Sequence, residues 1–439
     1  MWSRSVTARF DGGRITSNAG GLLLQEVDQR IDLLSRFSRC FLDGRDQKRV
    51  RHGVRAMLAQ RVYALALGYE DLNDHEQLRE DPVLMLLAGS EEPDQRLAGK
   101  STLNRLELGG EPDANDRYKK VHYNSAAIDK LLVNIFLEAH AQAPPEIVLD
   151  LDATDLALHG HQEQRFFHGF YNQYCYLPLY IVCGEHLLGV RLRPANVDAS
   201  AGSLEEIERI VQQIRQAWPT TRIILRADSG FCREALMGWC EAQQVDYVFG
   251  FARNERLRRI IDAEMQQAAA TYQRTGQPAR VFTEFTYETN HTWSQPRRVV
   301  AKAEQIEGKE NPRYVVTSLA PADWPAQRLY EQLYCARGDM ENRIKEQYAL
   351  FAGRVSAATL RANQLRLYLS AVAYVLMCGF RRLALSGTGW ARAQCQTIRL
   401  QLLRFGAQVR ITARKVWVSI ASSYPHWRLF QHAYMQLRS

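Results

Sequence analysis

The sequence predicts an α/β protein, built on a mixed β-sheet with helices on its faces and flanked by helical regions. Two observations lead to this expectation. Between residues 146 and 251, short apolar segments of strand length alternate with amphipathic segments of helical period. The chain has 439 residues, 46% hydrophobic and 24% charged, which is ordinary for a globular protein and long enough for two or three domains.

Residues 1–130 are expected to form a helical region. The segment 54–67 has helical periodicity and carries no Pro or Gly. A basic cluster precedes it, in which Lys48, Arg49 and Arg51 are the residues we expect to contact an anionic partner. A helical arm that only packs against the rest of the chain has the same pattern, so both interpretations stay open.

Residues 131–253 are expected to hold the first part of the core. The expected strands are 146–152, 174–182, 186–192, 222–228 and 245–251, and the expected helices are 203–217 and 233–243. This order, β-β-β-α-β-α-β, predicts antiparallel strands continued by parallel ones. It is the order of RNase H-like folds, in which the first and fourth strands are neighbours.

The pattern changes after residue 253. Residues 254–327 are expected to form a β-rich insertion, because the segments 280–288, 292–304 and 313–319 alternate apolar and polar residues. Residues 328–390 are expected to complete the core, and residues 391–439 to form a basic C-terminal region. The apolar stretch 367–380 is short for a membrane span and has arginines at both ends, so we expect a buried helix and no membrane.

Charge is distributed unevenly along the chain. The 13 Lys and Arg residues after Glu346 are accompanied by no Asp or Glu, so the first 346 residues carry 8 − 13 = −5 of the net charge of +8. A segment this long that carries only positive charges indicates a polyanionic binding partner, most simply nucleic acid. The bias toward Arg fits bidentate contact with phosphate or guanine. We therefore expect double-stranded DNA as the partner, with Arg253 as a further contact in the basic run 253–259.

Two of the expected strands end in carboxylates. Asp152 ends the first strand and Asp228 ends the fourth, and the two would converge at one sheet edge in the expected order. Carboxylates only a few ångströms apart repel each other unless a divalent cation binds between them. Asp150, one pleat deeper on the same strand face, and Asp155, just past the strand, are alternatives to Asp152.

A third acid, Glu341, lies in the segment 334–346, which is expected to be one continuous helix. Residues four apart share a helix face, so Arg337, Glu341 and Lys345 line up, with Tyr334 one turn before them. A surface ion-pair ladder would have the same pattern. If this helix crosses the sheet edge that carries the two aspartates, the three acids would form an oxygen-ligand site for two Mg²⁺ ions, with Mn²⁺ as a substitute.

Several motifs share their order and spacing with one known family. They are Leu149 to Asp155, His159 to Glu163, Phe170 to Leu179, Leu225 to Arg233 and the run Tyr334-x2-Arg337-x3-Glu341. In these motifs the sequence resembles the DDE transposases of bacterial insertion sequences, in particular the group with a β-rich insertion between the second Asp and the Glu. The spacing of 341 − 228 = 113 residues leaves room for that insertion. The Lys usually found seven residues after the Glu is Tyr348 here, and Lys345 keeps the helix face instead.

The resemblance implies a function and a role for each residue. The function would be cutting DNA at the ends of an insertion sequence and joining those ends to target DNA by metal-dependent phosphodiester hydrolysis and strand transfer. Asp152, Asp228 and Glu341 would bind the metal ions. Arg337 and Lys345 would hold the phosphate of the DNA end, with Tyr334 beside it. A homodimer on DNA is implied as well, because two ends must be held together.

Two other functions fit parts of the pattern. An RNase H-like nuclease would cut DNA without joining it, and a catalytically silent relative would only bind DNA.

No apolar export segment follows Met1, so we expect a bacterial cytoplasmic, nucleoid-associated protein.

Overall fold

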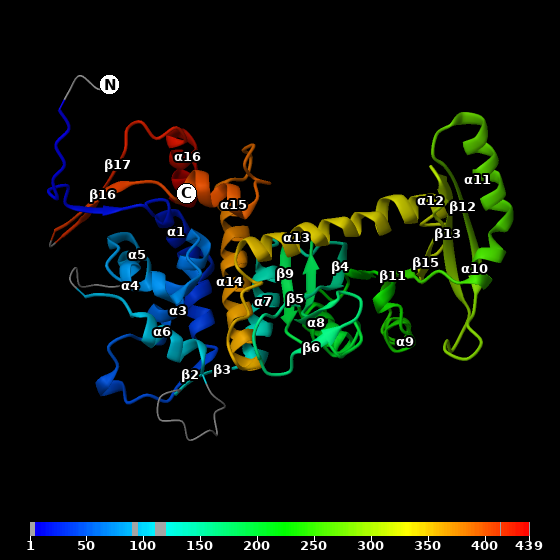
Figure 1. Ribbon diagram of the computed structural model, residues 1–439, viewed down its shortest axis with the longest axis horizontal. Helices are drawn as coiled ribbons and strands as arrows, with labels where there is room; N and C mark the ends of the chain where they lie inside the picture. The colour runs from blue at the N-terminus through cyan, green and yellow to red at the C-terminus, as the bar shows by residue number, and fades with distance from the viewer. Residues whose placement is uncertain (1–4, 90–94, 110–119, 413, 439) are drawn as a thin grey trace. The chain divides into compact units, whose positions relative to one another are not determined.

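The computed structural model describes residues 5–89, 95–109, 120–412 and 414–438 (Figure 1). The chain divides into two compact units. Unit 1 consists of Met1–Leu131, Gly160–Glu163 and Lys345–Ser439, and unit 2 consists of Leu132–His159 and Gln164–Ile344. The fold is mixed α/β, as the sequence predicts.

Unit 2 is built on one large mixed sheet. In chain order its first strands are β4 (Glu146–Ala153), β8 (Leu179–Cys183), β9 (His186–Arg191), β10 (Arg222–Ala227) and β11 (Asp246–Phe251). Their order across the sheet is β9-β8-β4-β10-β11. Strand β10 lies between β4 and β11 and is parallel to both, whereas β8 is antiparallel to β4. The expected first and fourth strands, β4 and β10, are therefore neighbours.

Both faces of this sheet are buried. Alternate residues of its central strands point to opposite sides, so each strand contributes side chains to two separate cores. On one face, Leu225 belongs to the core cluster that includes the apolar side of α8 (Ser203–Ala217) and of α9 (Glu234–Ala242). On the other face, Ile224 packs with Leu329 and Leu333 of the helical segment η4 (Leu329–Tyr334). Each such side chain contributes about 1.5–3 kcal/mol on full burial. The helix that leads to Glu341 is thus held against the sheet from its start.

The predicted strand 174–182 is wrong as a single element. Its first part is β7 (Gln173–Tyr176), which pairs with β5 (Leu156–Ala157) and β6 (Phe166–His168) in a separate small sheet. Only β8 joins the large sheet. Pro178 stands between the two parts, and a proline has no backbone N–H to donate to a sheet ladder.

The segment after β11 extends the same sheet. Strand β15 (Arg313–Thr317) pairs antiparallel with β11, and β13 (Arg297–Ile306), β12 (Ala279–Tyr287) and the short β14 (Lys309–Glu310) follow outward. Two helices, α10 (Glu255–Ile260) and α11 (Asp262–Thr275), come before these strands, and α11 packs on β12 and β13 (Figure 1). The alternating pattern indicated the strands, but it did not show these helices.

Unit 1 is organised around the long helix α14 (Leu360–Ala384). Helices α1 (Gly21–Ile31), α3 (Val54–Leu67) and α16 (Trp427–Arg438) pack against it. By length and composition α14 is the one helix of the described residues that meets the criteria for a membrane span, but 89% of its apolar window is buried inside the protein. This burial agrees with a core helix.

Segments from the N-terminal and C-terminal parts of the sequence pair in one small sheet of unit 1. Strand β1 (Arg14–Thr16) pairs with β16 (Ala407–Ile411), which pairs with β17 (Val416–Ile420). The remaining elements of the N-terminal part are α2 (Leu33–Ser38), β2 (Phe41–Asp43), η1 (Gln47–Arg49), η2 (Leu72–Asp74), α4 (His75–Leu78), α5 (Pro82–Leu87), α6 (Lys100–Glu107) and β3 (Val121–Tyr123). The other elements are α7 (Ser125–Glu138), η3 (Ser229–Phe231), α12 (Ala326–Arg328), η5 (Cys335–Arg337), α13 (Gly338–Ala349), α15 (Cys395–Ile398) and η6 (Arg399–Leu403).

Candidate active site

The two predicted strand-end aspartates lie on neighbouring strands of unit 2. Asp152 is the penultimate residue of β4, and Asp228 directly follows β10. The parallel register pairs Ala227 with Leu151, so the next residue on each strand is one of the two acids. The Asp228 side chain also accepts a hydrogen bond of 2.8 Å from the backbone N–H of Gly230, which fixes it as the cap of the short helix η3.

Asp152 lies in a field of like charges. The pKa of its carboxyl group is raised to about 6, mainly by burial; the Arg337 guanidinium lowers this pKa, and the negative charges of Asp228 and Glu341 act in the same direction as burial. In the metal-free protein the Asp152 carboxyl group therefore takes up a proton more readily than an exposed aspartate does, and a cation bound beside it would favour its charged form.

The helical segment that carries Glu341 is not the single regular helix that the sequence predicts. It begins as a π-helical turn, η4, tightens into the 3₁₀ turn η5, and becomes α-helical in α13. Arg337 is the last residue of η5, and Glu341 lies in the first turn of α13. Changes of helix type of this kind are frequent at functional sites. The simple four-residue spacing therefore does not describe the relation of Arg337 to Glu341.

Arg337 supplies a cation to Asp152. Its Nη1 lies 3.4 Å from Asp152 Oδ2, and both side chains are largely buried, with exposed fractions of 21% and 15%. The two residues come from elements 185 positions apart in sequence. Exposed ion pairs contribute little to stability, and fully buried ones carry a large desolvation cost. This pair, which is largely but not fully buried, lies between these two situations.

Asp150, the alternative to Asp152, is engaged elsewhere. Arg226, its register partner on β10, donates two hydrogen bonds of 2.6 and 2.7 Å to its two carboxylate oxygens. The same guanidinium donates a third, of 2.6 Å, to the carbonyl oxygen of Leu333 in η4. Asp155, the other alternative, accepts a hydrogen bond from Gln173. Arg226 thus joins β4, which carries Asp152, and β10, which Asp228 follows, to η4, which precedes the helix of Glu341.

Two tyrosines border the acids. Burial raises the pKa of Tyr334, and the charge of Asp228 raises it further. Burial raises the pKa of Tyr171 to about 12, with the charges of Asp155, Asp152 and Asp228 acting in the same direction. Tyr334 was singled out from the sequence. Tyr171 was not, although it lies in the quoted motif Phe170 to Leu179.

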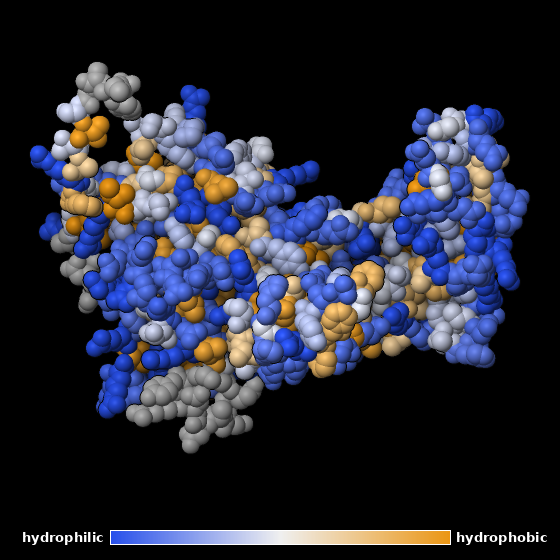
Figure 2. All heavy atoms as spheres, viewed as in Figure 1, coloured by the Kyte–Doolittle hydropathy of each residue, from blue (hydrophilic) through white to orange (hydrophobic). Residues whose placement is uncertain are grey.

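The other predicted DNA contacts lie on the surface. Arg253 is exposed between β11 and α10 in unit 2, and Lys345 is an exposed residue of α13 that begins the C-terminal segment of unit 1. Lys48 and Arg49 are exposed in η1, and Arg51 is exposed just after it. The face drawn in Figure 2 is mostly hydrophilic, with apolar residues in small groups. All five side chains are placed where a polyanion can reach them.

The three acids supply the donor atoms that a divalent cation needs, although they are not arranged as a preformed metal site. In the part of the chain that the structure describes, no three His, Cys, Asp or Glu side chains stand as a ready-made metal site. Asp152, Asp228 and Glu341 nevertheless offer only oxygen donors, which Mg²⁺ and Mn²⁺ prefer. The carboxyl group of Asp152 is in addition buried and lies in the field of the other two acids, which a bound cation would offset.

Comparison with known proteins identifies the class. The family model described as "Transposase DDE domain group 1" matches residues 1–439. The chain therefore belongs to this family of transposases. No curated protein sequence matches it. Among solved structures, it is similar to a piggyBac transposase in a synaptic complex with hairpin DNA, at 12% identity and a TM-score of 0.43, over 87% of this chain and 78% of that one.

Proposed function

We propose that this transposase cuts DNA at the ends of its element and joins those ends to target DNA, using Asp152, Asp228 and Glu341 as a metal-dependent catalytic site. The observation that supports the proposal is the placement of the acids: Asp152 and Asp228 end neighbouring parallel strands, and the charges of Asp228 and Glu341 both act on the Asp152 carboxyl group. The acids come from β4, from the end of β10 and from α13, which are far apart in sequence.

The strand order supports an RNase H-like core. The order β9-β8-β4-β10-β11, with β8 antiparallel to β4 and β10 parallel to it, is the order expected from the sequence. In open α/β sheets, ligands bind at the carboxyl ends of the strands. Asp152 and Asp228 both stand at such ends.

The acids would hold two Mg²⁺ or Mn²⁺ ions. Bound there, these ions would activate a water or a 3′-hydroxyl as nucleophile and stabilise the leaving oxygen of the phosphodiester. Asp152 and Asp228 would contribute their oxygens from the rigid sheet, and Glu341 from the first turn of α13. Gly230 N–H would keep the Asp228 carboxylate oriented through its 2.8 Å hydrogen bond.

Arg337 would hold the DNA phosphate. In the structure its guanidinium neutralises Asp152 at 3.4 Å. The guanidinium would present two N–H groups to two oxygens of the DNA phosphate, a bidentate contact that arginine makes well. Tyr334 would flank the same phosphate, with Lys345 further along α13. Lys48, Arg49, Arg51 and Arg253 would contact the backbone of double-stranded DNA. We further propose that the active species on DNA is a homodimer.

A strand-transfer assay tests the proposal. The purified chain is incubated with Mg²⁺, a supercoiled target plasmid and duplexes that end in the sequences flanking its gene. The proposal predicts plasmid molecules covalently joined to the 3′ ends of the duplex. Cleavage without joining would instead make the protein an RNase H-like nuclease. Binding without either reaction would make it a catalytically silent DNA-binding protein.

A further inference from the structure

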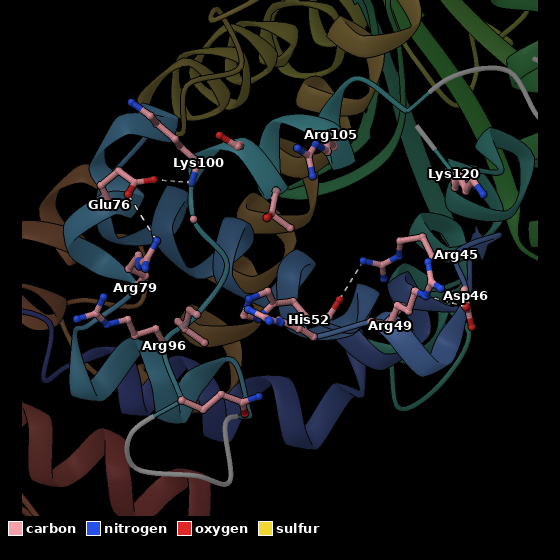
Figure 3. A pocket seen from close by; sticks show the side chains of 17 residues that line it. Arg45, Asp46, Arg49, His52, Glu76, Arg79, Arg96, Lys100, Arg105 and Lys120 are labelled. Carbon is pink, nitrogen blue, oxygen red and sulfur yellow. Dashed lines mark hydrogen bonds and ion pairs between the residues drawn. The ribbon is translucent and has the colours of Figure 1, made fainter. Parts of the chain in front are cut away.

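A large basic pocket lies in unit 1 (Figure 3). Its volume is about 1280 Å³, which exceeds the roughly 300–1,000 Å³ of small-molecule sites. Of its 17 lining residues, eight are Lys or Arg and two are Asp or Glu. Figure 3 shows the labelled side chains around a common open space. The size and charge together indicate a polyanion rather than a small ligand.

The cations are only partly neutralised by the acids of the pocket. Arg45 pairs closely with Asp43 at 2.7 Å and Arg96 with Glu80 at 3.1 Å. Arg49 and Arg79 make only long contacts of 3.5 Å with Asp46 and Glu76. The Nε of Arg79 is buried and has no hydrogen-bond partner among the described residues. Burial lowers the pKa of His52, and the charges of Arg79, Arg45 and Arg51 lower it further. Such a field attracts phosphates from several directions.

One wall of the pocket is the helix α6. Its first residue, Lys100, lines the pocket together with Ser101, Thr102 and Arg105. Ser101 and Arg105 are exposed and lie four residues apart, so they share one face of the helix. Both are side chains that hydrogen-bond to base edges in DNA grooves, and arginine does so in bidentate fashion to guanine.

The opposite side of α6 is fixed to the core of unit 1. Leu103 and Leu106 are almost fully buried, and so is Glu107. Glu107 pairs with Arg61 at 2.7 Å and with Arg366 at 2.9 Å. A short helix held this firmly can present its outer face without bending.

The start of α6 is fixed as well. The backbone N–H of Lys100 donates to Glu76 Oε1 at 2.9 Å, and the Lys100 ammonium donates to Asn73 Oδ1 at 3.1 Å. The Arg79 guanidinium packs closely on the neighbouring Gly99, since an added Cβ there would lie 2.8 Å from Arg79 Nη1. The helix and the cations around it therefore form one preorganised surface.

We propose that this pocket is a double-stranded DNA interface in which α6 reads base edges and the surrounding cations hold the phosphate backbone. The major groove of B-DNA, about 12 Å wide, admits one α-helix. The proposal deepens the proposed function, on which its choice of DNA rests. It assigns sequence reading to Arg105 and to the outer face of α6, and it adds Arg79, Lys100 and Lys120 to the contacts expected from the sequence.

Fluorescence anisotropy with the full-length chain tests this interface in EDTA, so that cleavage plays no part. The probes are a 30-base-pair duplex selected by the chain from a random pool and the same duplex with its sequence scrambled. Arg49→Ala is expected to weaken binding of both duplexes equally and to reduce the slope of log K against log salt by about one. Arg105→Ala is expected to reduce the preference for the selected duplex by about fivefold or more.

Two matched variants sharpen the test. Arg105→Lys keeps the charge, so it should retain affinity for the scrambled duplex and still lose the preference. Arg280→Ala removes one exposed arginine of β12, which pairs with Glu331 and does not line the pocket, and should change both affinities less than twofold. Thermal melting of each variant verifies that it folds, and Lys100→Gln serves as a second α6 variant.

The outcomes separate this inference from the catalytic proposal. Unchanged preference in Arg105→Ala and Arg105→Lys, or losses matched by Arg280→Ala, would overturn the assignment of α6 while leaving the catalytic site untouched. Equal affinity for single-stranded DNA would also contradict it. The interface would be supported, and the proposed reaction contradicted, if the Arg105 variants lose the preference for the selected duplex while the original chain binds DNA but does not cut it.

Discussion

Arg226 and Asp150 face each other across two central strands, joined by hydrogen bonds of 2.6 and 2.7 Å. The side chains are 9% and 5% exposed. The third hydrogen bond of Arg226, to Leu333 O, attaches the helical segment of Glu341 to the same pair. The pair lies one pleat below Asp152, so it supports the candidate site without belonging to it.

Removing one partner of this pair is expected to be costly. Asp150→Asn or Arg226→Met would leave a buried charge without compensation, which costs about 3–5 kcal/mol. Urea denaturation measures the loss. The double variant Arg226→Met/Asp150→Leu should recover a large part of it, because no buried charge remains. Losses that simply add in the double variant would show that the two side chains do not act as a pair.

Gly250 allows Tyr334 to approach the sheet. A Cβ added at Gly250 would lie 2.5 Å from the Tyr334 hydroxyl and 2.9 Å from the backbone N of Ser229. Gly250→Ala should therefore destabilise the protein by about 1–3 kcal/mol and displace Tyr334. Adding Tyr334→Phe removes the hydroxyl and should recover part of the loss in thermal melting. No recovery at all would place the clash entirely at the backbone after Asp228.

The pKa of Asp152 predicts a dependence of stability on pH. Because the folded-state pKa is about 6 and the ordinary value is 3.8, the folded protein binds more protons between these pH values, and stability falls as pH rises through this window. In metal-free buffer, Asp152→Asn should therefore be more stable than the original chain at pH 8, by roughly 1–3 kcal/mol. The difference should vanish below about pH 4. A variant equally destabilised at both pH values would contradict this account.

Divalent cations should offset the loss of stability that the ionised Asp152 carboxylate causes at high pH. Mg²⁺ or Mn²⁺ binds the charged form of the three acids and not the unfolded chain, so it should raise the melting temperature with increasing concentration at pH 8. The effect should weaken below about pH 6, where protons compete for Asp152. Glu341→Gln should reduce the shift. An equal shift in Glu341→Gln and in the original chain would locate metal binding elsewhere.

The sheet and its two aspartates were predictable from the sequence because each rests on a local signal. Apolar strand segments that end in Asp152 and Asp228 place both acids at one edge once the strand order is known. The change from π-helix to 3₁₀ helix before Glu341 was not predictable, since it accompanies packing of Leu329 and Leu333 against Ile224 of a distant strand. A strand pattern alone does not contain that contact.

Two positioning residues were missed for different reasons. Arg226 interrupts the apolar strand 222–228, and a charge in a buried strand usually indicates a charged partner. That signal was present, and Asp150 was the complementary charge on the neighbouring strand. Tyr171 gave no such signal, because its proximity to the acids depends on how the small sheet of β5, β6 and β7 folds beside β4.

Cleavage by Glu341→Gln tests the central claim most directly. The variant keeps the size and helix propensity of the side chain and removes only its charge. With Mg²⁺ and a duplex carrying the element end, we expect cleavage to fall at least a hundredfold, while DNA affinity in EDTA and melting temperature stay close to those of the original chain. Cleavage that persists at the original rate, or a loss of cleavage matched by an equal loss of DNA binding, would contradict a catalytic role for Glu341.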